Sequence, residues 1–180
     1  MESRELAVDI AFPEAHPLVL DLGCGNGLFL AALAALRPDR NVLGIEKKAY
    51  RVRQATRRVA GLPNARVVHA AAGEVLAALP PRSVASVYLL FNDPWPKRRH
   101  AERRLVQIDF VRLLDNCLQP DGVFYFATDS WPYAAWAEEA FRTSAWRTEH
   151  WSVPSGWPET EFEQRFASAG VRIHRFQAIR

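Results

Sequence analysis

From residue 17 onward the chain alternates short apolar runs with longer stretches in which apolar positions recur at helical spacing. The short runs predict five buried strands, at residues 17–21, 42–46, 66–70, 83–91 and 122–128. The longer stretches predict helices at residues 28–36, from 47 to about 61, 102–118 and 132–144. Strands that alternate with helices predict an α/β fold with a mostly parallel, doubly wound sheet.

Two of these helices have a definite apolar face in the sequence. The basic second helix places its apolar residues along one side, namely Ala49, Val52, Thr56 and Val59. The third predicted helix has a longer stripe of Leu105, Ile108, Val111, Leu114 and Leu118. Near the C-terminus, Gly170 separates residues 162–166 from residues 171–179, and the two segments predict a closing pair of strands.

Composition indicates a globular protein without metal or disulfide. The 180 residues are 49% hydrophobic and 24% charged, which predicts one domain over 1–180, with 1–16 as a short N-terminal arm. Cys24 and Cys117 have no paired spacing and no nearby histidine cluster, so we expect neither a disulfide framework nor a metal site. The N-terminus lacks the pattern of a signal peptide, and no 18-residue apolar run is present. We therefore expect a soluble, cytoplasmic protein that does not contact a membrane.

Positive charge is concentrated in two windows. Residues 47–58 hold six, and residues 97–104 hold five, of the 23 lysines and arginines. Such windows can be the solvated faces of two helices. Clustered Lys and Arg are also the electrostatic footprint of a surface that binds nucleic-acid phosphates.

An acidic residue follows or ends four of the five predicted strands, namely Asp21, Glu46, Asp93 and Asp129. In doubly wound sheets, ligands bind beyond the carboxyl ends of the strands. Acids also cap the helices that follow strands, which accounts for one or two of the four. Four together predict a ligand site at this edge.

The first strand leads into a glycine loop, Asp21-Leu22-Gly23-Cys24-Gly25-Asn26-Gly27. Its spacing is G-x-G-x-G, whereas dinucleotide-binding folds carry G-x-G-x-x-G. An acid directly before the loop suits a cationic amine better than a pyrophosphate, and S-adenosylmethionine has an ammonium, a sulfonium and no phosphate. Glu46, 25 residues after Asp21, can accept hydrogen bonds from ribose hydroxyls. The pattern favours an S-adenosylmethionine-dependent methyltransferase over a nicotinamide dehydrogenase.

Residues 91–100, FNDPWPKRRH, combine an acid, a rigid turn and a basic cluster. With this segment, extended to residue 107, and with DLGCGNG, GIE, FATD and TEFEQR, the chain from about Leu18 onward resembles the bacterial tRNA (guanine-N7)-methyltransferases. That family methylates the guanosine at position 46 of tRNA. The long segment is specific to the family, whereas other methyltransferases share the first two motifs.

The resemblance implies a class I methyltransferase (Rossmann-like) fold with a C-terminal antiparallel strand. It implies that S-adenosylmethionine is bound by Asp21, Gly23, Gly25, Gly27, Glu46 and Asp93. Asp93 would also be the catalytic residue, between methyl donor and guanine. The implied tRNA-binding residues are Lys97, Asp129, Thr160, Glu161, Phe162 and Glu163. The enzyme would act without an obligatory protein partner, as a monomer or homodimer.

Four positions depart from the family pattern. Ala71 stands where members usually have an acid that reads adenine, and Asn92 stands where a proline is usual. Glu161 replaces a lysine of the C-terminal motif, and Phe166 replaces a glycine after its arginine.

Guanine N7 carries an unprotonated lone pair, so its methylation needs no strong general base. We expect Asp93 to accept hydrogen bonds from guanine N1–H and its amino group, and to stabilise the positive charge that forms. Trp95, between two prolines, either stacks on a base or packs the turn. Residues 97–104 would contact phosphates. Two alternatives stay open: a methyltransferase acting on another RNA position or a small molecule, and a non-catalytic RNA-binding module with a residual cofactor pocket.

Overall fold

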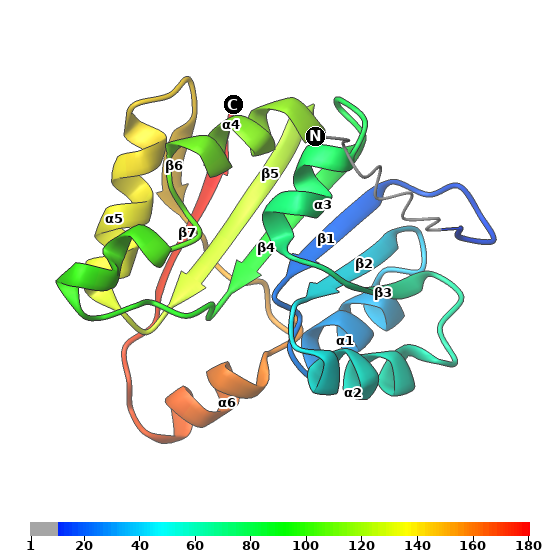
Figure 1. Cartoon of the computed structure of the whole chain (residues 1–180). Helices are drawn as coiled ribbons and strands as arrows, with labels where there is room; N and C mark the ends of the chain where they lie inside the picture. The colour runs from blue at the N-terminus through cyan, green and yellow to red at the C-terminus, as the bar shows by residue number, and fades with distance from the viewer. Residues whose placement is uncertain (1–10) are drawn as a thin grey trace.

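The computed structural model describes residues 11–180, apart from the side chain of Arg98, so residues 1–10 of the predicted arm lie outside the described residues. Seven strands form one sheet in the order β3-β2-β1-β4-β5-β7-β6 (Figure 1). The parallel strands are β1 (Leu18–Leu22), β2 (Asn41–Glu46), β3 (Ala65–His69), β4 (Val84–Leu90) and β5 (Leu118–Thr128). Two antiparallel strands, β7 (His174–Ile179) and β6 (Arg147–His150), complete the sheet. The predicted mostly parallel sheet with a C-terminal antiparallel strand is confirmed.

Helices cover both faces of the sheet. The first cluster of buried side chains includes residues of α3 (Ala72–Ala78), α4 (Ile108–Cys117) and α5 (Trp131–Arg142). The second, on the opposite face, includes residues of α1 (Leu28–Leu36) and α2 (Ala49–Val59). The last helix, α6 (Glu161–Ser168), lies beyond the carboxyl ends of the parallel strands (Figure 1). Among residues 11–180, no helix is long and apolar enough to span a bilayer.

Strand β1 explains why the sequence shows continuous apolar runs instead of alternation. Leu20 and Leu22 belong to the cluster under α3, α4 and α5, whereas Val19 belongs to the cluster under α1. Because both faces are covered, both sets of side chains are buried. Asp21 shares the α1 face with Val19 and is buried too.

The predicted helix over 102–118 was wrong in its first third. A six-residue 3₁₀ helix, η1 (Arg98–Arg103), comes first, and α4 begins only at Ile108. Between them Arg104 and Gln107 are extended, and the buried Val106 donates its backbone N–H to the Tyr133 hydroxyl at 3.4 Å. Tertiary contacts therefore override the helical spacing, and Ile108, expected in the buried stripe, is 40% exposed.

The predicted C-terminal pair of strands was also partly wrong. Residues 162–166 lie in α6, which begins at a capping box between Thr160 and Glu163. Strand β7 pairs instead with β5 and with β6, a short polar strand that the apolar pattern did not predict. Helix α3 was not predicted either. On α2 the buried residues are Ala55 and the expected Val59, whereas the expected Ala49 and Thr56 are exposed.

Candidate functional site

The four strand-end acids meet at one edge of the sheet, as predicted. Strands β2, β1, β4 and β5 are neighbours and run parallel, so their carboxyl ends point the same way (Figure 1). Asp21 and Glu46 are buried, whereas Asp93 and Asp129 are exposed. Since β1 and β4 are adjacent, the glycine loop and the turn that carries Asp93 begin side by side.

The glycine loop depends on backbone that other residues rarely adopt. Gly23, Gly25 and Gly27 all have left-handed φ angles, of 73°, 58° and 79°. The amides of Gly23 and Cys24 donate to the carbonyl of Ile45 at 2.7 and 3.1 Å, which fixes the loop to the end of β2. A Cβ on Gly27 would lie 2.8 Å from the Cα of Ala55, so the start of α1 packs directly on α2.

Glu46 supports the loop with its carboxylate. One oxygen accepts from the Gly25 amide at 3.1 Å, and the other accepts from the Lys48 amide at 2.8 Å. These two bonds fix the carboxylate at the end of β2. Each oxygen keeps a second lone pair for a hydroxyl donor such as a ribose.

Asp21 is a buried acid that lacks a partner. Its side chain is 4% exposed, and its Oδ2 has no hydrogen-bond partner among residues 11–180. Burial, and secondarily the charge of Glu46, raise the pKa of Asp21 to about 7. A cationic group brought beside the loop would satisfy the free oxygen and favour the ionised form. The ammonium of S-adenosylmethionine is such a group, so the residues fit this cofactor.

The structure adds two residues to the site that sequence reasoning missed. Asn26 donates from Nδ2 to Glu161 at 2.7 Å, and its Oδ1 accepts from the Leu28 amide, so the loop is joined to the first turn of α6. Arg51 places Nη1 3.2 Å from the position of a Cβ on Gly25. The only sequence signal for Arg51 was its membership of a charge cluster, and Asn26 gave none.

The turn after β4 holds Asp93 by unusual backbone geometry. Phe91 and Trp95 have φ angles of 54° and 45°, which are left-handed values that cost energy for bulky residues. The Trp95 amide donates to Asp93 Oδ1 at 3.1 Å, which orients the carboxylate. The Phe91 ring stacks on Phe162 of α6, at 6.2 Å between centroids. The turn therefore connects the sheet edge to α6.

Arg104 is not a phosphate ligand, and its inclusion in that predicted surface was wrong. Its side chain is buried, with the residue 7% exposed. The guanidinium donates to the carbonyls of Pro94 and Pro132, at 3.0 and 3.4 Å, and lies over the rings of Tyr133 and Trp136. Arg104 thus fixes the turn next to Asp93 from inside the protein.

Trp95 packs within its own turn. The Arg103 guanidinium lies 5.1 Å from the centre of its ring, and the His100 ring meets it edge-on at 5.8 Å. These contacts favour the packing interpretation of Trp95 over a free stacking platform. The buried Oδ1 of Asn92, where a proline was expected, has no partner among the described residues.

The expected tRNA-binding residues lie in different environments. Lys97 and Asp129 are exposed. Thr160 and Glu163 are buried and bond to each other, and Glu163 also accepts from Arg175 at 2.7 Å. The 160–163 segment therefore reaches the site mainly through Glu161 and Phe162, and its proposed contact with tRNA stays a prediction.

Ala71, at the position of the usual adenine-reading acid, has no polar side chain of its own. Ala71 is exposed at the start of α3, and its amide donates to Glu74 at 3.1 Å. The Ala71 backbone N–H is therefore already occupied. Two cavities, of about 200 and 380 Å³, lie toward the amino ends of the strands and do not include the glycine loop.

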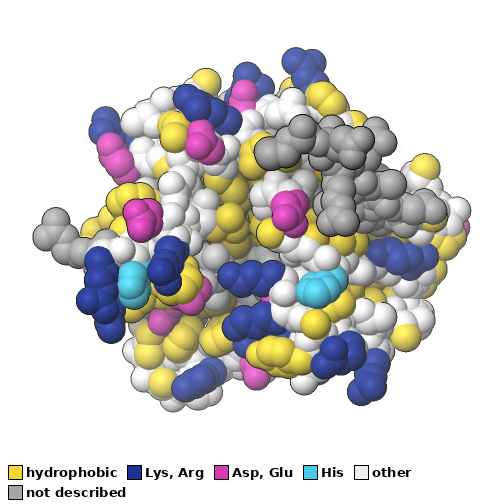
Figure 2. All heavy atoms as spheres, viewed as in Figure 1, with side chains coloured by type: hydrophobic (Ala, Val, Ile, Leu, Met, Phe, Trp, Pro, Cys, Tyr) yellow, Lys and Arg dark blue, Asp and Glu magenta, His cyan; other side chains and the backbone are white. Residues whose placement is uncertain are grey.

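Exposed cations lie on both sides of the site. Figure 2 shows Lys and Arg side chains along the lower part of the face, near α2, α6 and η1. The exposed members of the two predicted clusters are Lys47, Lys48, Arg53, Arg57 and Arg58 near or on α2, and Lys97, Arg99 and Arg103 near or on η1. This arrangement suits a long polyanion that crosses the carboxyl edge.

Comparisons with known proteins agree with this geometry. A family model described as a putative methyltransferase matches residues 15–176. The tRNA (guanine-N(7)-)-methyltransferase of Acinetobacter baylyi is 36% identical over 89% of this chain and 69% of its own length. That of Leifsonia xyli is 41% identical over 93% of this chain and 78% of its own length. Among solved structures, 16S rRNA methyltransferase KamB has a TM-score of 0.66 at 20% identity, covering 90% of this chain and 86% of its own, which shows a shared fold.

Proposed function

The chain belongs to the family of tRNA (guanine-N7)-methyltransferases, and we propose that it methylates guanine N7 at position 46 of tRNA with S-adenosylmethionine. The observation that carries the proposal is the unpartnered, buried oxygen of Asp21 next to the glycine loop. Asp93, in the turn after the neighbouring strand β4, lies at the same edge. A cofactor amine and a substrate base would therefore meet between β1 and β4.

The cofactor end of the site is formed by β1 and β2. Asp21 would pair with the ammonium of the methionine part, and Glu46 would accept hydrogen bonds from the ribose. The left-handed glycines leave the loop surface free of side chains, so the ligand can approach the backbone. When bound, S-adenosylmethionine supplies an electrophilic methyl group on a sulfonium.

The chemistry at guanine requires positioning more than proton transfer. N7 would attack the methyl carbon through an in-plane lone pair while the bond from that carbon to the sulfonium breaks and leaves a neutral thioether. No proton has to leave N7 first. The reacting atoms must be held in line at about 3–3.5 Å. Asp93, fixed by the Trp95 amide, would accept hydrogen bonds from N1–H and the 2-amino group of guanine. Its negative charge would also stabilise the cationic base that forms.

The tRNA would be bound chiefly through its phosphates. Exposed cations of α2 and η1 lie on either side of the proposed guanine position. Phosphate contacts of this kind orient a nucleic acid without reading its sequence. Lys97, Asp129, Glu161 and Phe162 would contact the substrate nearest the reacting base. We place the enzyme in the cytoplasm, acting as a monomer or homodimer without another protein.

Methyl transfer from labelled S-adenosylmethionine to unmodified tRNA, followed by mapping of the label, tests the proposal. We expect N7-methylguanosine at position 46. Label on a different base would assign the enzyme to another RNA position. Tight tRNA binding without label would indicate a non-catalytic RNA-binding module.

A variant pair tests the role given to Asp93. Asp93→Ala should abolish transfer, because it removes the carboxylate that would position guanine. It should leave tRNA binding intact, because the phosphates carry most of that binding and the exposed Asp93 side chain bonds only to the neighbouring Trp95 amide among the described residues. The control is Glu138→Ala, which removes an exposed acid from α5 and should leave the rate unchanged. Near-normal turnover of the Asp93 variant would rule out a central role for this residue.

A further inference from the structure

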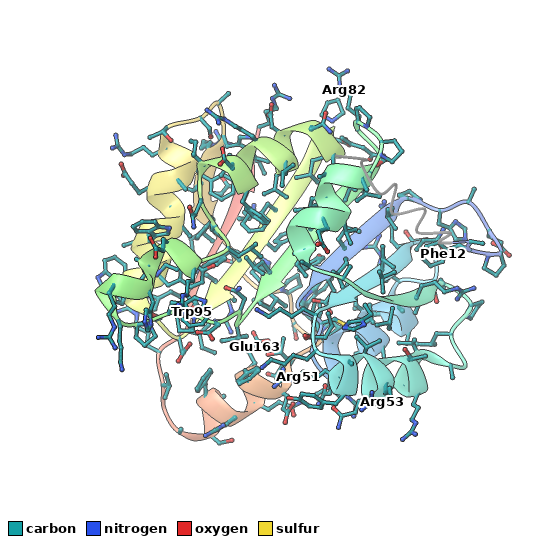
Figure 3. All side chains as sticks on the ribbon, in the orientation of Figure 1. Phe12, Arg51, Arg53, Arg82, Trp95 and Glu163 are labelled. Atoms are coloured by element: carbon teal, nitrogen blue, oxygen red, sulfur yellow. The ribbon has the colours of Figure 1, made fainter. Side chains whose placement is uncertain are left out.

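Arg51 differs from the other cations of α2 in its position. It is the third residue of the helix and is half-buried, whereas Arg53, Arg57 and Arg58 are exposed. Figure 3 shows Arg51 beside the start of α6, with Arg53 farther along α2. Arg51 Nη1 lies 3.2 Å from where a Cβ on Gly25 would be, so the guanidinium covers the middle of the glycine loop.

The guanidinium of Arg51 has unused donors. Its Nε donates to the Tyr50 hydroxyl at 3.1 Å, and no other hydrogen bond of its side chain is found among residues 11–180. Glu46 and Glu161 both act on its charge, yet neither forms an ion pair within 4.0 Å. The two Nη groups, which form the fork that suits a carboxylate, are therefore available beside the loop.

Asp21 and Arg51 approach the glycine loop from different elements. Asp21 comes from the end of β1 with a free carboxylate oxygen, and Arg51 comes from the start of α2 with free guanidinium donors. An α-amino acid group carries an ammonium and a carboxylate on one carbon atom. A negative group and a positive group that both lie at one loop are complementary to such a zwitterion.

We propose that Arg51 binds the carboxylate of the methionine part of the cofactor and so distinguishes S-adenosylmethionine from ligands that lack this group. The inference rests on the proposed function, because it takes the glycine loop as the cofactor site. A tRNA phosphate is the other anion available to Arg51. The geometry favours the cofactor, because Arg51 faces Gly25 with free donors, whereas Arg58 donates to the Asn26 carbonyl of the loop at 2.8 Å and Arg53 is exposed.

Calorimetric titration with two ligands tests the inference. One ligand is S-adenosylmethionine, and the other is its decarboxylated form, which keeps the ammonium, sulfonium and adenosine. Arg51→Gln should weaken binding of S-adenosylmethionine by about 10- to 100-fold, the usual effect of losing a hydrogen-bonded charge. It should leave binding of the decarboxylated ligand unchanged. Arg51→Lys should give an intermediate loss, since it keeps the charge without the fork.

Arg53→Gln is the matched control, because it removes an exposed arginine from the same helix. Arg53→Gln should leave the affinities for S-adenosylmethionine and for its decarboxylated form unchanged. Thermal unfolding without ligand should show that all variants are folded. Equal losses for both ligands, or no loss for either, would overturn the inference. So would a loss of tRNA affinity in Arg51→Gln with cofactor affinity unchanged. Failure of the unaltered protein to bind S-adenosylmethionine would instead refute the proposed function.

Discussion

The substitution Asp21→Asn removes one buried carboxyl group while almost preserving its size. Burial, with a smaller contribution from Glu46, raises the pKa of this carboxyl from 3.8 to about 7 in the folded protein. The unfolded chain ionises near the lower value, so between these two pH values the folded state holds more protons than the unfolded state. Stability without cofactor therefore falls as pH rises from about 4 to about 7 and stays reduced above it.

The magnitude follows from the two pKa values. At about 1.4 kcal/mol per pH unit, ionising Asp21 costs roughly 4 kcal/mol of unfolding free energy once the pH is well above 7. At pH 5 the same group costs roughly 1.5 kcal/mol, because most folded molecules are still protonated. The unfolding free energy of Asp21→Asn, relative to that of the unaltered protein, should therefore be higher at pH 8 than at pH 5 by roughly 2.5 kcal/mol.

Urea unfolding at the two pH values, without cofactor, measures this difference. Asp39→Asn is the control, since Arg37 holds the pKa of the exposed Asp39 at about 2. That group is ionised in both states at pH 5 and pH 8, so its removal should shift stability equally at both. A stability difference for Asp21→Asn that does not change with pH would show that Asp21 ionises normally and would refute the reasoning.

The same reasoning predicts that Asp21→Asn loses affinity for S-adenosylmethionine and that the unaltered protein binds it less tightly as pH falls below about 7. Gly27→Ala should cost roughly 2–4 kcal/mol of stability through its left-handed backbone and its contact with α2, measured by urea unfolding. Arg104→Gln should lose about 1–3 kcal/mol in the same assay and lower kcat more than KM, because the turn before Trp95 loses its anchor. Neutralising Lys97 and Arg99 together should reduce the salt slope of tRNA binding by roughly 1.5–2.

Three controls accompany these variants. Gly61→Ala has open space and no left-handed φ, so it should be neutral or stabilising by up to about 1 kcal/mol. If Gly27→Ala were equally harmless, the close packing of the loop on α2 would be contradicted. Arg147→Gln, on the distant β6, should leave the salt slope unchanged. An unchanged slope after neutralising Lys97 and Arg99 would remove them from the tRNA interface. A kcat unaffected by Arg104→Gln would argue against its positioning role.

The strand ends and the edge at which their acids gather could be predicted because their signals are local. Parallel strands buried on both faces appear as continuous apolar runs, and the acid that follows each run lies at a common edge. Asp21 and Glu46 were therefore placed correctly on β1 and β2 from the sequence. The glycine loop could also be predicted, because three glycines at G-x-G-x-G spacing directly after an apolar run are a local signal.

The errors arose where distant contacts decide the structure. The aromatic residues 162 and 166 suggested a strand, but their rings pack on Phe91 from a helix that begins at the Thr160 capping box. Arg104 was grouped with exposed cations because its sequence neighbours are basic. Its burial depends on Tyr133 and Trp136, about 30 residues away along the chain. The charge cluster that contains Arg51 did not predict its position over Gly25, because that position requires the packing of α2 on the loop.

The central claim is best tested with two tRNA transcripts that differ at one nucleotide, with guanosine or adenosine at position 46. Each is incubated with the purified protein and labelled S-adenosylmethionine, and N7-methylguanosine is located by chain cleavage at the modified base. We expect incorporation approaching one methyl group per transcript with guanosine at position 46, and none with adenosine there. Equal incorporation into both transcripts, or none into either, would contradict the proposed function.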